Sequence, residues 1–60
     1  MKIRVMVSAI FGGYLVQATI AEGEAVRVTS FPDDLQSIGD AELTDGRHFF
    51  ASSSVHIVPV

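Results

Sequence analysis

The fold of this chain is decided by residues 2–21, KIRVMVSAIFGGYLVQATIA. Apolar residues alternate with other residues on both sides of Gly12-Gly13, and successive side chains of a strand point to opposite faces. A glycine pair between two such runs predicts a β-hairpin with a two-residue turn. The pairs predicted on its apolar face are Phe11 with Tyr14, Ala9 with Val16, Val7 with Ala18 and Val5 with Ile20. The pairs predicted on the other face are Ser8 with Gln17 and Met6 with Thr19.

The chain is expected to turn again directly after this hairpin. Glu22-Gly23-Glu24 has turn composition, and residues 25–30 resume an alternating pattern. A strand returning from this turn would place Val26 beside Ile20 and extend the apolar face. Residues 2–30 are therefore predicted to form a three-stranded meander.

A short helical turn is predicted at about residues 32–38. Pro32 suits the first position of a helix, and acidic residues follow it in the first turn. Leu35 and Ile38 are spaced for one helical face, and Gly39 follows as a stop signal. A helix this short is not stable alone, so Leu35 and Ile38 are expected to dock it on the sheet.

Asp45-Gly46 predicts a second hairpin, whose register the sequence leaves open. A two-residue loop would pair Ala41 with Phe50, whereas a three-residue loop would pair Ala41 with Phe49. Which phenylalanine is buried depends on that choice. A last strand is predicted over residues 55–60, with Val55 and Ile57 inward. Pro59 lacks an amide donor, which favours a place at the edge of the sheet.

These elements predict a mainly β fold, built as one domain over residues 1–60. The expected form is a small antiparallel sheet, or a barrel of SH3-like or OB-like shape, with five to six strands and one helical turn. A chain of 60 residues buries only about 60% of its extended surface. The chain has no cysteine, which excludes disulfides and cysteine-based zinc sites.

An export signal is the main alternative interpretation of the first twenty residues. Lys2 and Arg4 precede an apolar run, as the charged start of a signal peptide would. Polar residues and glycines interrupt this run, and strand pairing already explains its apolar positions. The run is also too broken for a membrane span of about 20 residues. We therefore expect a soluble cytoplasmic protein that does not associate with membranes.

No enzyme motif is found, and the prediction is a protein without catalytic residues, metal or cofactor. Ser52-Ser53-Ser54, the two histidines and Asp45 supply the residue types of a hydrolase triad, but the nucleophile-elbow spacing is missing. His48 and His56 are not placed to converge on one metal ion. Gly12-Gly13 joins two strands and does not lead into a helix, so it does not fit a phosphate cradle.

The charges are unevenly distributed along the chain. All seven acidic residues lie between positions 22 and 45, where Arg27 is the only base, so that segment carries −6 while the whole chain carries −3. The simpler interpretation is a set of solvated turns, because turns favour such residues. The alternative is a surface that binds a basic groove on another protein. The candidate protein-binding residues are Glu22, Glu24, Asp33, Asp34, Asp40, Glu42 and Asp45.

Direct nucleic-acid binding is the second hypothesis. Arg47 and Phe49 lie on the same side of a predicted strand, and a cation beside an aromatic ring is how small barrels stack single-stranded bases. The chain has only four basic residues and a pI near 5.0. The electrostatic attraction that dominates nucleic-acid affinity is therefore absent or adverse.

The grouped acidic residues, the small size and the lack of cysteine give a profile that resembles small phage-encoded inhibitors of bacterial defence, such as anti-CRISPR proteins. That resemblance implies binding to a host nuclease or surveillance complex, with carboxylates in place of DNA phosphates. The first hypothesis is therefore a non-enzymatic inhibitor or adaptor that binds a larger protein. A third hypothesis is a structural subunit whose fold is completed by oligomerisation, for example as a homodimer.

Overall fold

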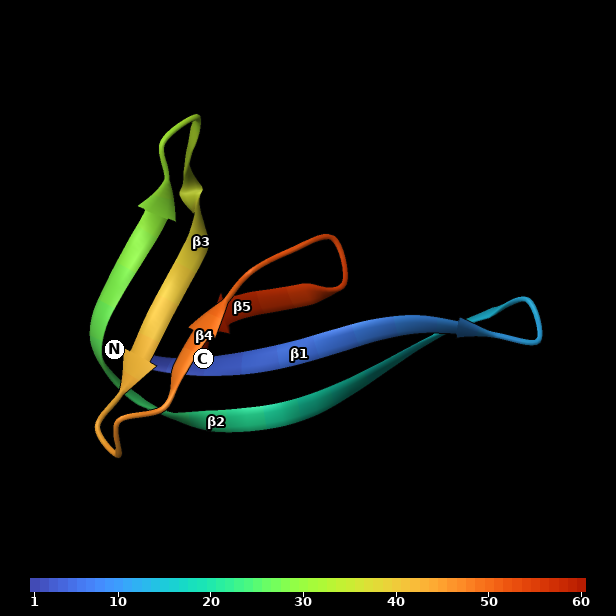
Figure 1. Cartoon of the computed structure of the whole chain (residues 1–60), viewed down its shortest axis with the longest axis horizontal. Coiled ribbons are helices and arrows are strands. Elements are labelled where there is room, and N and C mark those ends of the chain that lie inside the picture. The colour runs from blue at the N-terminus through green and yellow to red at the C-terminus, as the bar shows by residue number, and fades with distance from the viewer.

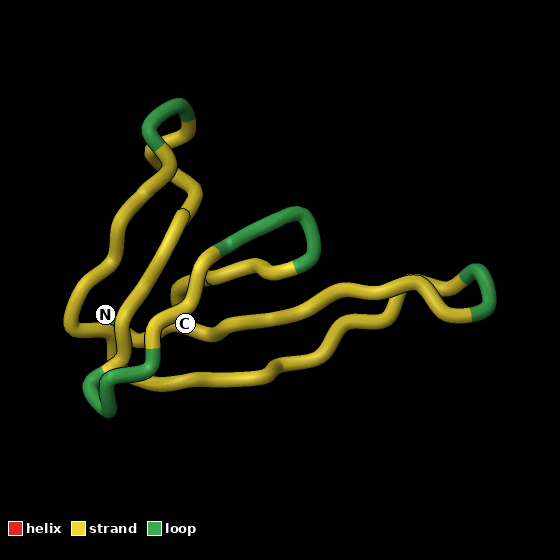
Figure 2. The backbone as a smooth tube through the Cα atoms, viewed as in Figure 1, coloured by secondary structure: helices red, strands yellow, loops and turns green.

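A computed structural model describes all 60 residues and contains only strands and the loops between them (Figure 2). The strands are β1 Lys2–Phe11, β2 Tyr14–Phe31, β3 Asp34–Leu43, β4 His48–Phe50 and β5 Val55–Pro59. They form one antiparallel sheet in the order β4-β3-β2-β1-β5. The mainly β prediction is confirmed, with five strands.

The long strand β2 belongs to both halves of the sheet. Its first part pairs with β1 as far as Glu24, and its second part pairs with β3 from Ala25 onward. Figure 1 shows β2 bending sharply between these two parts. The bend brings β3 close to β5, so the two halves of the sheet enclose a core between them.

The core is small. Six residues are buried: Ile3, Val5, Ala21, Ala41, Leu43 and Ile57. They come from β1, β2, β3 and β5, and the two largest fully buried side chains, Ile3 and Val5, both lie on β1. Partly buried side chains such as Val28, Ile38 and Phe49 pack around them. Burial is thus concentrated where the two halves of the sheet meet.

The first hairpin has the predicted register over most of its length. Phe11 pairs with Tyr14, and the predicted partners continue in step as far as Met6 with Thr19. The predicted pairing of Val5 with Ile20 is wrong, because a β-bulge shifts the register and pairs Val5 with Ala21. Ala21 is buried and Ile20 is 51% exposed. A bulge increases the local bend of a strand, and this one lies just before β2 folds over.

The predicted turn at Glu22-Gly23-Glu24 is wrong, and with it the three-stranded meander. These residues continue β2, with Glu22 opposite Arg4 and Glu24 opposite Lys2. Opposite charges facing each other across two strands stabilise the pairing, so the acidic residues extend the ladder where a turn was expected. Residues 25–30 are the second part of the same strand.

The predicted helical turn at residues 32–38 is also wrong. Pro32 and Asp33 form the turn between β2 and β3, and Leu35, expected to dock on the sheet, is 77% exposed. Proline fixes a φ angle that suits the first corner of a turn as well as the first turn of a helix. The carboxylate of Asp34 accepts hydrogen bonds from the Gln36 amide and the Ser37 hydroxyl, which stabilises this end of the hairpin.

The second hairpin has the three-residue loop. Ala41 pairs with Phe49 and Glu42 with His48, and Gly46 in the loop has a φ of 92°. Phe49 is therefore half-buried against the core, while Phe50 is 66% exposed. The last strand is confirmed as β5 at the sheet edge, with Ile57 buried.

Replacing Gly46 with alanine is expected to lower the free energy of unfolding by about 1 kcal/mol, because a Cβ atom is disfavoured at positive φ. The matched control is Gly23→Ala, where φ is not positive and the added Cβ would lie 3.7 Å from Leu43. Urea denaturation at one protein concentration measures both variants. Equal losses in the two variants would contradict the role of the φ angle.

Shortening Ile3 to valine is expected to reduce the free energy of unfolding by about 1 kcal/mol, the usual cost of removing one buried methylene. Val26→Ala is the control, since Val26 is 62% exposed and exposed substitutions usually change stability by less than about 0.5 kcal/mol. Thermal and urea unfolding report both values. If Ile3→Val lowered the free energy of unfolding less than Val26→Ala does, that would contradict the place of Ile3 in the core.

Candidate protein-binding surface

The end of the first hairpin projects from the body of the protein as an apolar arm. We define the arm as residues 9–20, all of which are exposed. Strand β5 covers β1 only as far as Val7, and β3 pairs with β2 only from Ala25. Figure 1 shows the arm extending well beyond the other strands. The arm contains no charged side chain.

The arm exposes large apolar side chains in a continuous group. Ile10, Phe11, Tyr14 and Leu15 are 74%, 68%, 76% and 67% exposed, respectively. Soluble monomers rarely expose contiguous apolar patches larger than a few hundred Å², and larger patches mark interaction sites. The arm therefore has the composition of a binding surface.

The two faces of the arm differ. The face that continues from Ile3, Val5 and Val7 is here called the core face. Within the arm it carries Ala9, Phe11, Tyr14, Val16 and Ala18, and no polar group other than the Tyr14 hydroxyl. The opposite face alternates apolar and polar pairs, with Ile10 opposite Leu15 at the tip and the Gln17 amide donating to the Ser8 hydroxyl at 3.4 Å. Only Ile10 and Leu15 make its tip apolar. The core face is therefore the more strongly apolar of the two.

The outer edge of β2 is free along the arm. The Ser8 amide donates to the Ser54 carbonyl at 2.9 Å, so the backbone of Ser8 points away from β2. In an antiparallel ladder the directly opposite residue then points its own amide and carbonyl away from β1. That residue is Gln17, and no strand pairs with its outer side. An additional strand could pair there.

The alternating sequence predicts that these apolar pairs belong to the core. That prediction is wrong for the arm, whose residues are all exposed. The pairs form, but no other element covers them. Ten paired residues in each strand extend about 33 Å, whereas β5 pairs with β1 only as far as Val7 and β3 pairs with β2 only from Ala25. The uncharged stretch of this hairpin, residues 5–21, is long for a chain of 60 residues. That length was the signal from which an uncovered hairpin end could have been predicted.

The predicted acidic residues do not form one bare acidic surface. Glu22 accepts a hydrogen bond from the Nε of Arg4 at 2.6 Å and lies 3.4 Å from the Lys2 ammonium. Arg27 donates to Glu42 at 2.6 Å. The Arg4 hydrogen bond, followed by that of Lys2, lowers the pKa of Glu22 below its usual value. Much of the acidic charge is neutralised by pairing within the chain.

The other acidic residues are distributed over separate loops and ends. Asp45 accepts hydrogen bonds from the backbone amide and the Nε of Arg47, and the backbone bond is the main reason that its pKa is lowered. Glu24 accepts from the amino group of Met1 at 2.8 Å. Asp33 and Asp34 lie at the turn between β2 and β3, at the opposite end of β3 from Asp45.

The residues considered for nucleic-acid stacking are engaged with each other. The guanidinium of Arg47 lies 5.9 Å from the centre of the Phe49 ring, and the same guanidinium donates to Asp45. Phe49 packs against the core. On the other side of β4, the rings of His48 and Phe50 lie 4.5 Å apart. An exposed stacking platform beside a free cation is therefore not formed by Arg47 and Phe49.

The groups considered for catalysis or metal binding lie apart. His48 Nε2 is 3.9 Å from Asp40, whereas His56 lies on β5. The serines of residues 52–54 form a turn in which the Ser54 amide donates to the Ser52 hydroxyl at 3.4 Å. No cluster of three or more potential metal ligands is present.

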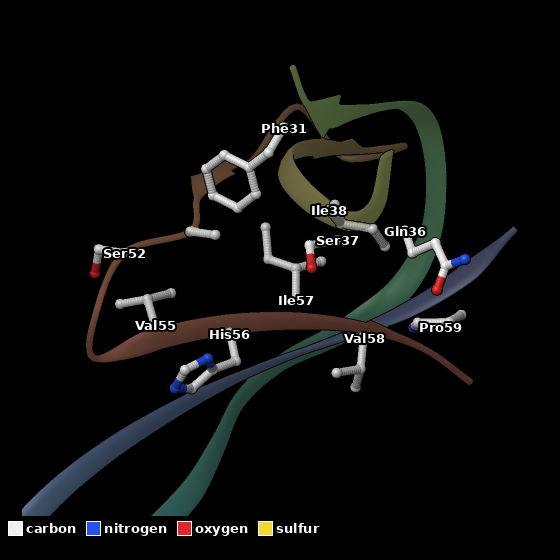
Figure 3. A pocket seen from close by; sticks show the side chains of 11 residues that line it. Phe31, Gln36, Ser37, Ile38, Ser52, Val55, His56, Ile57, Val58 and Pro59 are labelled. Atoms are coloured by element: carbon white, nitrogen blue, oxygen red, sulfur yellow. The ribbon is translucent and has the colours of Figure 1, made fainter. Parts of the chain in front are cut away.

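A shallow hollow of about 290 Å³ lies between β5 and the end of the β2-β3 hairpin. Phe31, Ile38 and Ile57 supply its apolar wall, and Figure 3 shows Val55 and Ile57 rising from β5 toward Phe31. Its volume is at the lower limit for small-molecule pockets. No aspartate, glutamate, lysine or arginine lines the hollow.

Comparisons with protein-family models, with curated proteins and with solved structures found no match to this chain. None of its segments forms a helix with the length and apolar composition needed to cross a membrane.

Neutralising Glu22 as Glu22→Gln is expected to remove part of the acid sensitivity of the fold. Because the folded-state pKa of Glu22 is lowered, its contribution is present above the ordinary value of 4.5 and is lost as the pH falls through the lower folded value. The variant should therefore be less stable than the natural chain at neutral pH and should lose less stability on acidification. Urea denaturation at a series of pH values measures this.

High salt provides the control for that experiment, because it screens exposed ion pairs. The difference between Glu22→Gln and the natural chain at neutral pH should shrink in high salt. A difference that is independent of both salt and pH would contradict an electrostatic role for Glu22.

Proposed function

We propose that this chain is a non-enzymatic protein-binding module whose binding element is the apolar arm. The observation that supports this most directly is the exposure of Ile10, Phe11, Tyr14 and Leu15 on a projecting hairpin without charge. Water disfavours such a surface, at roughly 25 cal/mol per Å² of apolar area. A partner that covers the arm removes this cost.

The shape of the arm also favours recognition of a protein. A two-stranded ribbon presents an apolar face together with a backbone edge, and the outer edge of β2 is free from Tyr14 to Gly23. Proteins recognise such edges by adding a strand, with side-chain contacts supplying specificity. The hollow beside Phe31 also lies next to an edge strand, β5, but that strand has only five residues and ends in a proline.

The acidic residues rank second as a contact surface. Glu22, Glu42 and Asp45 are each held by a basic side chain of the same chain, so a partner would have to displace that base. Asp33 and Asp34 lie at the tip of the β2-β3 hairpin and are exposed. Neither is paired with a basic side chain, although the Asp34 carboxylate accepts hydrogen bonds from Gln36 and Ser37. An inhibitor of the anti-defence type would use the arm for affinity and this tip for contact with a basic groove.

The proposal is tested by capturing partners from a lysate of the source host with the tagged chain and with the double variant Phe11→Ser/Tyr14→Ser. We expect capture to be lost in this variant, because it removes the two aromatic anchors, and such anchors commonly dominate binding energy. Quantitative mass spectrometry of the captured proteins is the measurement.

Two further variants make the result specific. Leu35→Ser removes a side chain that is 77% exposed but lies outside the arm, so capture should persist. Asp33→Lys/Asp34→Lys reverses the charge at the other hairpin tip. Capture that survives the arm variant but not this charge reversal would assign binding to the acidic residues and refute the arm.

A further inference from the structure

We infer that the partner of the arm is a second copy of this chain, and that two arms pack core face against core face around a two-fold axis. The inference rests on the proposed function of the arm and names its occupant. Four properties of the arm favour a second copy: its area, its lack of charge, the small core of the isolated chain, and the order of large and small side chains along it.

The area matches a modest dimer interface. Phe11, Tyr14 and Val16 are 68%, 76% and 45% exposed. With about 150–250 Å² for each fully exposed aromatic side chain, the core face of one arm offers roughly 500 Å², including its alanines. Stable interfaces begin at about 600 Å² per partner. Two arms therefore bury somewhat less than that bound, which corresponds to a weak, reversible dimer.

The distribution of charge allows two copies to meet at the arm. The chain carries −3 overall, so two copies repel each other at most orientations. Residues 5–21 contain no charged side chain, and the acidic residues all lie beyond position 21. Contact through the arms keeps the like charges of the two copies apart.

The core of the single chain is small for an independently folded domain. Six of 60 residues are buried, and the chain has neither a disulfide nor a cluster of potential metal ligands. Chains of this size commonly need such a staple or self-association. A second copy is present wherever the chain is made. The apolar surface that two copies bury together would add to the stability of the fold.

The core face has large residues at the tip and small ones near its middle and base. Phe11 and Tyr14 form the last pair before the turn, followed by Ala9 with Val16 and then by Val7 with Ala18. Two arms that run in opposite directions, centred on the pair Ala9 and Val16, place the aromatic pair of each over Val7 and Ala18 of the other. Large side chains then meet small ones, as close packing requires.

Face packing explains the apolar surface better than edge pairing does. If two copies joined only through the free edges of β2, the two core faces would lie side by side in one wider sheet and stay in contact with water. Stacked sheets lie about 10 Å apart, a spacing that aromatic side chains fill. Covering Phe11 and Tyr14 therefore requires the faces to meet.

The first test is sedimentation equilibrium of the whole chain from low micromolar to several hundred micromolar concentration. We expect a reversible monomer-dimer equilibrium. Val16→Glu, which places a charge on the core face, should weaken the dimer at least tenfold. Gln17→Glu places the same charge one residue away on the opposite face and should change the dissociation constant less than threefold. Equal effects of the two variants would overturn the inference.

The second test does not depend on the variants folding without their partner. The chain has no cysteine, so a single cysteine reports one contact. In the proposed packing Ala9 lies over Ala9 of the other copy, with the two backbones about 10 Å apart. A direct disulfide is too short for that separation, so Ala9→Cys should be joined into a covalent dimer by a short bismaleimide cross-linker. Ser8→Cys, on the opposite face, should remain largely unlinked. Faster linking of Ser8→Cys on a non-reducing gel would overturn the face-to-face arrangement.

The remaining outcomes separate this inference from the proposed function. A chain that stays monomeric at all concentrations, but loses a captured protein when Phe11 and Tyr14 are replaced, refutes the dimer and leaves the protein-binding arm standing. Binding of the monomer to zwitterionic lipid vesicles through the same residues would assign the arm to membranes and refute both. Arm variants that alter neither assembly nor capture would also refute both.

Discussion

The rest of the structure depends on the pairing of strand β2 with two different strands, β1 along its first part and β3 along its second part. Strand β2 pairs with β1 as far as Glu24 and with β3 from Ala25, so it must bend between them. The bend folds the sheet over Ile3 and Val5, and the bulge beside Val5 turns the small side chain of Ala21 inward. Without the bend the sheet would be flat, and its apolar side would have nothing to cover it.

The same arrangement explains why the arm is exposed. The first part of β2 has a free edge on the side away from β1, and its second part has a free edge on the side away from β3. Only the residues of β1 and β2 near the bend are buried by the other strands. β1 and β2 continue past this covered stretch to Gly12 and Gly13. The residues beyond it keep the alternating apolar pattern of a core strand although the chain supplies no element to pack on them. The arm is the best candidate for binding because its residues alternate as in a core strand but remain exposed to solvent.

The sequence predicted local pairing well and long-range packing poorly. The turn at Gly12-Gly13 and most of the first register follow from alternation and turn chemistry, which are local. The helical turn at residues 32–38 was wrong because Pro32, with acidic residues after it, suits a hairpin turn equally well. The turn at Glu22-Gly23-Glu24 was wrong because the charges of Lys2 and Arg4, twenty residues earlier, stabilise an extended strand there. The bulge and the bend lie where β1, β2, β3 and β5 pack together around one buried cluster, and the periodicity of a single strand does not report such packing.

The order of the strands in the sheet has a consequence for biosynthesis. β1, which supplies the two largest fully buried side chains, is flanked on one side by β5, which follows the other four strands along the chain. The opening hairpin closes through a tight turn and needs nothing downstream, whereas Ile57 can pair with Val5 only after all the residues between them have been made. A nascent chain therefore holds β1 without its second neighbour until β5 has been synthesised, and a chain truncated before β5 would leave the centre of the protein open to water.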